Sequence, residues 1–231
     1  MGAVAHLITR SLPDTTLASV DYPATFSDYP SSQTLGVLEL RRMIISHSAR
    51  CPDTKLALLG FSQGGHVIMD VLCGRPGDSD GGWEAVERLG GDGHGVVGVV
   101  TFGDPSHVAG AGFNRGTSVR DGLFPRQDIA ACDPYTPVIR EWCDTGDEFC
   151  DRGNNTKTHA GYFGRYMGAA AEFIVERYNA SLPERDEPTA AAPQVPVPEG
   201  STSGAKGLTA PVALASGLLM MMPAVLEWMG L

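Results

Sequence analysis

The sequence predicts an α/β fold in which helices cover both faces of a central parallel sheet, giving three layers. Two short runs, 55–59 (KLALL) and 95–102 (GVVGVVTF), are almost wholly apolar, which is typical of strands buried on both faces. Helical patterns separate these runs along the chain, and such alternation indicates a parallel sheet. Of the 231 residues, 42% are hydrophobic and 19% are charged, which excludes a wholly disordered chain and a coiled coil.

Each expected element follows from the spacing of its apolar residues and from the residues at its ends. Apolar residues that recur every three or four positions indicate helices, and short apolar or β-branched runs indicate strands. We expect the buried face of the longest helix to include Leu35, Leu38, Met43 and Ile44. In chain order, the sequence predicts helix 3–10, strand 16–20, helix 31–50, strand 55–59, turn 60–64, helix 65–72, helix 83–89, strand 95–102, strand 137–143 and helix 159–178.

The composition changes after residue 182 and divides the chain into three parts. Residues 1–182 carry the strand and helix patterns, and residues 183–207 are rich in Pro, Ala, Gly and Ser, which is typical of a linker. Residues 208–231 are mostly apolar. We interpret this tail as a signal for a glycosylphosphatidylinositol anchor, with a single membrane span or a dispensable tail as alternatives, because residues 208–226 are just long enough to cross a bilayer.

Charge and cysteine content narrow the classes of function. The formal net charge of −10 argues against nucleic-acid binding, because a binder displaces counterions with basic patches. Residues 1–10 lack the basic region and cleavage site of a signal peptide. The five cysteines lack the paired spacing of zinc sites, so disulfides are favoured, and we expect no metal and no cofactor.

Residues 60–64 (GFSQG) match the G-x-S-x-G pattern and join an expected strand to an expected helix. This context indicates a nucleophile elbow, a turn so sharp that glycines must flank a serine held in a strained conformation. Ser62 is therefore the candidate nucleophile, and the backbone N–H of Gln63 is a candidate donor to an oxyanion. The alternative is a glycine-rich turn that carries an ordinary surface serine.

A serine nucleophile needs a base to take its proton, and the base needs an acid to orient it. In hydrolases of this architecture the acid and then the histidine follow the serine along the chain. Asp147 and His159 fit this order. Asp144 and Glu148 are rival acids in the same loop, and the alternative interpretation is a solvated acidic loop beside a structural histidine.

Four segments together resemble the fungal cutinases and acetylxylan esterases, which form carbohydrate esterase family 5. The resemblance covers roughly residues 3–180, and the order and spacing of its motifs agree throughout. The motifs are 51–65 (CPDTKLALLGFSQGG), 102–105 (FGDP), 142–150 (WCDTGDEFC) and 158–163 (THAGYF).

This resemblance implies a three-layer α/β/α hydrolase-type fold without a lid, and the hydrolysis of esters. It implies Ser62 as nucleophile, His159 as general base and Asp147 as orienting acid, with the Gln63 N–H in the oxyanion hole. It also implies a disulfide between Cys143 and Cys150.

The beginning of the chain differs from the family's pattern. Members of the family open with a signal peptide, a cysteine, a first central strand and a loop of the type F-A-R-G-T, which supplies a second oxyanion donor. This sequence starts inside the helix that would follow, so we expect a truncated chain whose sheet lacks that strand. Cys51 would then lose its usual partner, and Cys73 and Cys132 would form the remaining disulfide.

The sequence therefore predicts a secreted or cell-surface serine esterase, which we expect to be a monomer. The motifs around 72–74, 102–105 and 158–162 favour an acetylxylan esterase acting on a polysaccharide, with a cutinase acting on polyester cutin as the alternative. A non-catalytic cell-surface protein that retains the scaffold is a further alternative. Asn154 and Asn179 begin N-glycosylation motifs, which fit secretion.

Overall fold

The computed structural model describes residues 1–75, 95–183 and 218–223, and for the last segment only the backbone. The expected helix 83–89, nearly all of the expected linker and much of the expected tail lie outside these residues. The helices are α1 (Gly2–Ser11), α2 (Tyr29–Arg50), α3 (Gln63–Cys73), η1 (a 3-10 helix, Ala130–Val138), α4 (Thr156–Ala160) and α5 (Tyr162–Ala180). The strands are β1 (Thr15–Val20), β2 (Lys55–Phe61), β3 (Val96–Phe102), β4 (Asn114–Gly116), β5 (Ile139–Cys143) and β6 (Leu218–Pro223).

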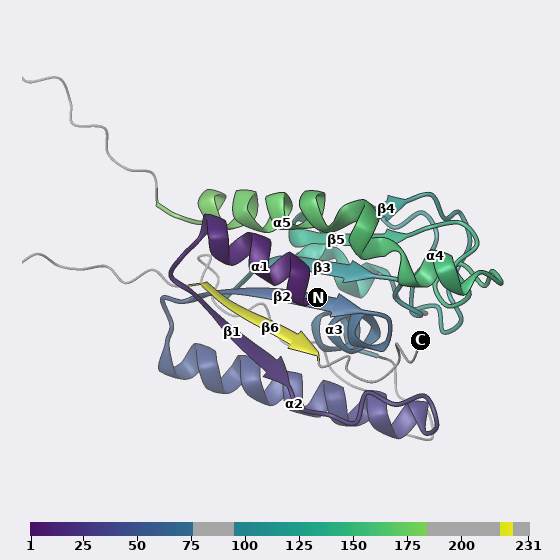
Figure 1. Ribbon diagram of the computed structural model, residues 1–231. Coiled ribbons are helices and arrows are strands. Elements are labelled where there is room, and N and C mark those ends of the chain that lie inside the picture. Colours follow the sequence, from purple (N-terminus) through teal and green to yellow (C-terminus); the bar gives the residue numbers. More distant parts are fainter. Residues whose placement is uncertain (76–94, 184–217, 224–231) are drawn as a thin grey trace, which may run out of the picture.

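A parallel sheet forms the middle layer, with strand order β1-β6-β2-β3-β5-β4. Helices α1 and α5 cover one face, and α2 and α3 cover the other (Figure 1). Successive residues of β2 serve the two cores in turn: Leu56 and Leu58 pack with the α2 and α3 side, and Ala57 and Leu59 with the α1 and α5 side. The sheet is thus buried on both faces, and the predicted three-layer α/β/α fold is confirmed.

The elements differ from the sequence predictions in several places. The expected strand 137–143 begins only at Ile139, because the residues before it continue the 3-10 helix η1. The expected helix 159–178 is split into α4 and α5 at Gly161. The short strand β4 was not predicted, since three residues carry too little apolar periodicity to be recognised.

The buried face of α2 was predicted correctly in its second half, where Ile44 is buried and Met43 packs against the core, but incorrectly in its first half. Leu35 and Leu38 are 48% and 46% exposed, whereas Gln33 and Gly36 lie on the buried face. A Cβ on Gly36 would lie 2.8 Å from a methyl group of Val67, so glycine allows α2 to approach α3 closely. Because the first turns of this face carry Ser32, Gln33 and Gly36, apolar periodicity pointed to the wrong side of the helix there.

The interior of the sheet contains a strand from the far end of the chain. Residues Leu218–Pro223 form β6, which pairs in parallel with β1 on one side and with β2 on the other. Where we expected a gap in the sheet, β6 therefore lies between β1 and β2 in the described structure. These residues also belong to the segment that we interpreted as an anchor signal or membrane span, and they are the part of it that the structure describes.

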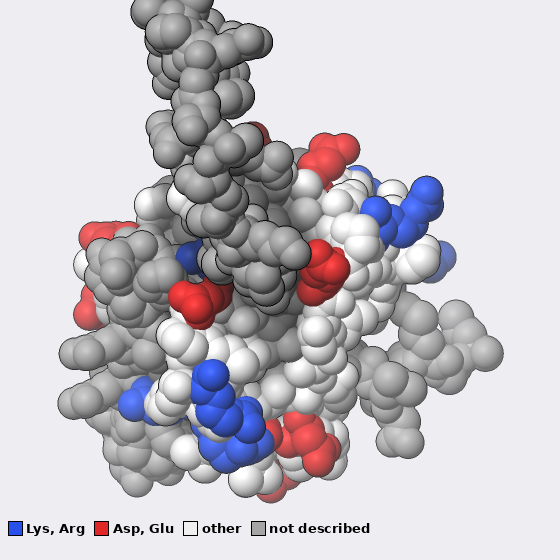
Figure 2. Space-filling model, turned by 90° about the vertical axis from the view of Figure 1, so that its left-hand side faces the viewer, with Lys and Arg blue, Asp and Glu red and all other residues white. Residues whose placement is uncertain are grey.

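The strands run so that their carboxyl ends lie at one edge of the molecule, where the loops after β2, β3 and β5 meet (Figure 1). The opposite edge, where the strands begin, carries basic and acidic side chains in separate small groups (Figure 2). In the described residues, the helices are too short or too polar to cross a membrane. The carboxyl edge of the sheet is where an open parallel sheet usually presents its functional loops.

Candidate active site

Ser62 lies in the turn between β2 and α3 and has a strained backbone. Its φ of 53° and ψ of −124° lie in a region that side chains other than glycine rarely adopt. A Cβ on Gly60 would lie only 2.6 Å from the carbonyl oxygen of Gly64, so the turn requires glycine before the serine. The Ser62 N–H donates to the carbonyl of Phe102 over 2.8 Å, which anchors the turn to the end of β3. This geometry is that of a nucleophile elbow.

The hydroxyl of Ser62 is a buried polar group. The residue is buried, and within the described parts of the chain no group forms a hydrogen bond with its Oγ. A buried polar atom normally has a partner, and an orphaned one indicates strain or a functional role.

Asp147 and His159 form a hydrogen-bonded pair. Asp147 Oδ2 accepts from His159 Nδ1 over 2.8 Å, and both residues are buried. Burial alone would raise the pKa of Asp147, but the hydrogen bond and electrostatic interaction with His159 and the amides of Cys150 and Phe149 lower it below its ordinary value. The carboxylate therefore stays ionised and holds the proton on Nδ1, which leaves Nε2 free to act as a base.

Aromatic rings and a close backbone contact fix the plane of the His159 imidazole. Its centroid lies 4.8 Å from that of Phe61 and 4.5 Å from that of Phe149. Gly103 has a φ of 61°, and a Cβ there would lie 2.7 Å from His159 Cε1. Because Phe61 directly precedes Ser62, these contacts bring the imidazole to the end of β2 where the serine lies.

The loop between Cys143 and Cys150 carries Asp147, and the expected disulfide closes it. Asp147 Oδ1 accepts from the backbone N–H groups of Phe149, over 2.7 Å, and Cys150, over 3.0 Å. The rival Asp144 faces elsewhere and accepts from Arg165 Nε over 2.9 Å. Of the candidate acids in this loop, Asp147 is the one that the described hydrogen bonds join to His159.

Gln63 is the first residue of α3, so its backbone N–H has no partner within the helix. Its side chain is held by a second segment of the chain. Its Oε1 accepts from Ser32 Oγ over 2.9 Å, and its Nε2 donates to the carbonyls of Thr25, over 3.3 Å, and Tyr29, over 3.4 Å. These bonds tie the first turn of α2 and the loop before it to the turn that carries Ser62.

The neighbouring His66 belongs to a separate set of contacts. Its Nδ1 lies 3.0 Å from the hydroxyl of Tyr29, and its Nε2 lies 3.6 Å from Asp70 Oδ2. Burial lowers the pKa of His66 to about 4. At neutral pH the imidazole is therefore uncharged.

Exposed aromatic side chains surround the site. Phe26 and Phe124 are 43% and 50% exposed. The ring of Phe26 lies 5.5 Å from that of Phe149, which in turn contacts His159, and Phe124 lies 5.2 Å from Tyr29. These rings come from loops distant in sequence, so spacing could not have identified them.

Buried polar groups behind the site were also missed by sequence reasoning. The Tyr162 hydroxyl donates to Asp147 Oδ2 over 2.8 Å, although Tyr162 reads in the sequence as an apolar residue of a helix. Asp104 is fully buried, and burial, together with the nearby charge of Glu141, raises its pKa to about 7. His107 pairs with the same Glu141. Only the FGDP motif hinted at this cluster.

The remaining predicted residues have clear positions. Cys73 and Cys132 form the second expected disulfide, and Cys51 is free and exposed. Asn154 and Asn179 are exposed, which leaves room for a glycan. Among the described residues, no cluster of His, Cys, Asp and Glu has the arrangement of a metal site.

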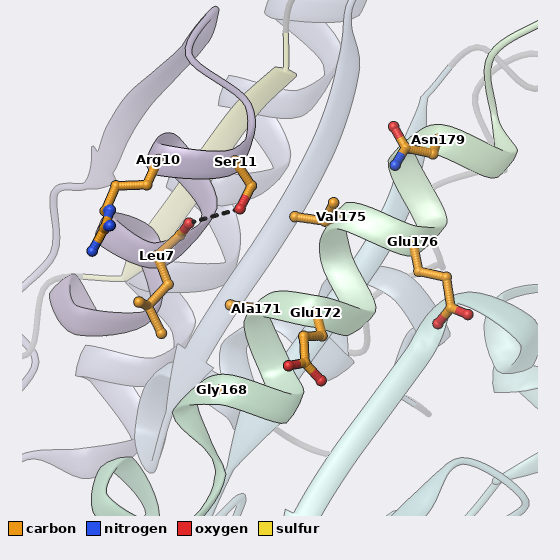
Figure 3. A pocket seen from close by; sticks show the side chains of 9 residues that line it. All are labelled: Leu7, Arg10, Ser11, Gly168, Ala171, Glu172, Val175, Glu176 and Asn179. Carbon is orange, nitrogen blue, oxygen red and sulfur yellow. Dashed lines mark hydrogen bonds between the residues drawn. The ribbon is translucent and has the colours of Figure 1, made fainter.

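A separate groove lies between α1 and α5 and contains none of these site residues (Figure 3). It is lined by Leu7, Arg10, Ser11, Gly168, Ala171, Glu172, Val175, Glu176 and Asn179.

Comparisons with known proteins identify relatives of the whole described domain. The family model described as "Cutinase" matches residues 1–178. "Cutinase 11" of Verticillium dahliae is 32% identical over 188 residues, covering 78% of this chain and 63% of that protein. "Acetylxylan esterase 2" of Talaromyces purpureogenus is 30% identical over 179 residues, covering 74% and 76%.

A solved structure, the catalytic core domain of acetyl xylan esterase from Trichoderma reesei, has the same fold. Its TM-score is 0.68 at 29% identity, over 78% of this chain and 89% of that chain. This chain spans less than two thirds of the length of the Verticillium protein.

Proposed function

The chain belongs to the cutinase family of carboxylic ester hydrolases, and on that premise we propose that it is a serine esterase. We propose Ser62 as its nucleophile, His159 as its general base and Asp147 as the acid that orients the base. The observation that carries the proposal is the 2.8 Å hydrogen bond between Asp147 and His159 beside an elbow serine in a strained conformation.

The reaction begins when Ser62 Oγ attacks the ester carbonyl carbon while His159 Nε2 takes the hydroxyl proton. The carbonyl oxygen becomes an oxyanion, which accepts from the backbone N–H of Gln63. Collapse of the tetrahedral intermediate breaks the bond to the alcohol, which leaves with the proton from His159. Water then attacks the acyl-enzyme in the same way, releasing the carboxylic acid and restoring Ser62.

Asp147 acts through the imidazole, and its carboxylate does not take up a proton during the reaction. Its ionised carboxylate keeps the proton on Nδ1 of His159, so Nε2 faces the reaction, and it stabilises the imidazolium that forms. The lowered pKa of Asp147 supports this role, because the carboxylate remains charged across the neutral range.

The substrate we propose is an acetyl ester on xylan. The likeness to the acetyl xylan esterase from Trichoderma reesei supports it, together with the relative from Talaromyces. The exposed rings of Phe26 and Phe124 favour a second candidate, an apolar polyester such as cutin, because apolar surface near the serine suits long acyl chains.

Two measurements test the proposal. A fluorophosphonate probe should label the wild-type protein and fail to label Ser62→Ala. Absence of labelling in the folded wild-type protein would favour a non-catalytic scaffold. Acetate release from acetylated xylan, compared with p-nitrophenyl acetate and p-nitrophenyl palmitate, then separates the substrates. Faster turnover of the palmitate ester would contradict acetylxylan as the substrate and support the polyester.

We also propose that the protein works outside the cell. Two disulfides support this, because such bonds persist in oxidising compartments. Cys51 provides a test, since the disulfides should resist alkylation in the native secreted protein while Cys51 reacts. Mass spectrometry of protein from the culture medium would report both secretion and the cysteines that were alkylated. Protein retained inside the cell with every cysteine as a free thiol would contradict the proposal.

A further inference from the structure

Tyr162 is the first residue of α5, and its ring is held on two sides. The residue is completely buried. Its ring stacks on Phe102 with centroids 5.8 Å apart and planes 10° apart. The Arg165 guanidinium lies 5.0 Å from the ring centre. The phenol oxygen is therefore held in one place by packing that does not involve the hydroxyl itself.

The hydroxyl of Tyr162 joins both halves of the loop that carries Asp147. It accepts from the backbone N–H of Asp144 over 2.8 Å and lies 3.3 Å from Cys150 Sγ. Because the amide of Asp144 can only donate, the phenol proton is free to donate to Asp147 Oδ2, 2.8 Å away. This is the same oxygen that accepts from His159 Nδ1.

The surroundings keep this proton on Tyr162. Burial, followed by the charge of Asp147, raises the pKa of Tyr162 far above its ordinary value. The hydroxyl is therefore a donor throughout the working pH range. The titratable and charged groups that face it or its ring are Asp144, Asp147, His159, Arg165 and Tyr166.

We propose that Tyr162 is a positioning residue for the reaction. Its hydroxyl holds the Asp147 carboxylate in the orientation that presents Oδ2 to His159, and it shares the negative charge of that oxygen. Sharing the charge limits how strongly Asp147 raises the proton affinity of the imidazole. This inference rests on the proposed serine esterase mechanism, in which Asp147 orients His159.

Tyr162→Phe tests the proposal, because it removes the hydroxyl and keeps the ring that packs on Phe102. We expect kcat to fall about 10- to 100-fold with KM little changed, since the base is misplaced by a fraction of an ångström. Asp147 then attracts the proton of His159 more strongly. The acid limb of the kcat/KM profile should therefore move to higher pH, by about half a unit.

Tyr166→Phe is the matched control. Tyr166 lies on the same helix and donates to Asp144 Oδ1 over 2.9 Å, but the bonds to Asp147 do not involve it. This variant should keep the wild-type kcat and pH profile. If Tyr162→Phe also keeps both, the proposal is wrong. If Tyr162→Phe lowers activity only in proportion to its folded fraction, with the acid limb unmoved, Tyr162 is structural and the proposal is equally wrong.

A second variant covers the case in which Tyr162→Phe does not fold. Replacing Tyr162 by 3-fluorotyrosine keeps the shape of the ring and makes the phenol a stronger donor. The acid limb should then move to lower pH, opposite to the shift in Tyr162→Phe, and an unmoved limb would contradict the proposal. Failure of the esterase mechanism is distinguishable, because the wild-type protein would then fail to react with the fluorophosphonate probe.

Discussion

The two halves of the sheet, one with β2, β3, β5 and β4 and the other with β1 and β6, are built differently. Strands β2, β3 and β5 adjoin each other and end in the elbow, the FGDP segment and the Cys143–Cys150 loop, so short local motifs place the candidate site. On the other side, β1 pairs with β6, whose residues follow β1 by about two hundred positions. The comparison teaches that chemistry can be encoded in local motifs while the sheet that carries them depends on distant pairing.

The largest expected effect comes from a substitution that removes the nucleophile and leaves both halves of the sheet intact. Ser62→Ala should lower kcat by about a million-fold, the loss seen when a serine nucleophile is removed from a triad. The substitution removes one hydroxyl that has no hydrogen-bond partner in the described residues, so the unfolding temperature should change little. Kinetics with p-nitrophenyl acetate and a thermal melt test this. Substantial residual activity would mean that another group is the nucleophile.

Removing either disulfide should affect stability and activity to different degrees. Replacing Cys73 and Cys132 by alanine opens a bridge between residues 59 positions apart and should cost about 4 kcal/mol. Replacing Cys143 and Cys150 opens a span of 7 and should cost about 2 kcal/mol, yet it should lower kcat more, because it frees the loop that holds Asp147. Urea unfolding and kinetics on both variants test the reversal, and the same ranking in both measurements would contradict it.

The distant side of the sheet is tested at Met220 in β6. Met220→Pro removes a backbone donor from a strand paired on both sides, so it should lower the free energy of unfolding by about 1–3 kcal/mol. Met220→Val keeps the donor and serves as the control. Urea unfolding measures both variants, and equal stability for the two would show that β6 does not hold this place in solution.

The smallest expected effect concerns Asp104, which lies buried behind the site. Its folded-state pKa of about 7 is above the ordinary value, because of burial and then of Glu141, so folding takes up a proton between about pH 4 and pH 7. The free energy of unfolding should therefore fall as pH rises through this window. Although burial opposes it, Glu141 raises the pKa of His107, so above pH 6.5 the loss of the His107 proton lowers the free energy of unfolding in the same direction.

Asp104→Asn should flatten the part of this decline below pH 6.5. Urea unfolding at pH 4.5 and pH 6 measures the slope in the variant and in the wild-type protein. An unchanged slope would mean that Asp104 does not titrate in this range. The described hydrogen bonds do not join the Asp104 carboxylate to β1 or β6. A flattened slope would therefore assign the pH response to the half of the sheet that carries the site.

The sequence by itself determined the parts in which neighbouring residues specify their own geometry. GFSQG requires a sharp turn because glycine alone tolerates the contact at Gly60, and almost wholly apolar runs indicate strands buried on both faces. The order of Ser62, Asp147 and His159 could be read in the same way.

Only the tertiary structure decided which distant surfaces meet. It placed Gly36 and Gln33 on the buried face of α2, inserted β6 between β1 and β2, and aimed the Tyr162 hydroxyl at Asp147. Each of these outcomes depends on a partner far away in the chain. Hydrophobic periodicity measures only how residues are spaced along one element, so it cannot identify the surface against which that element packs.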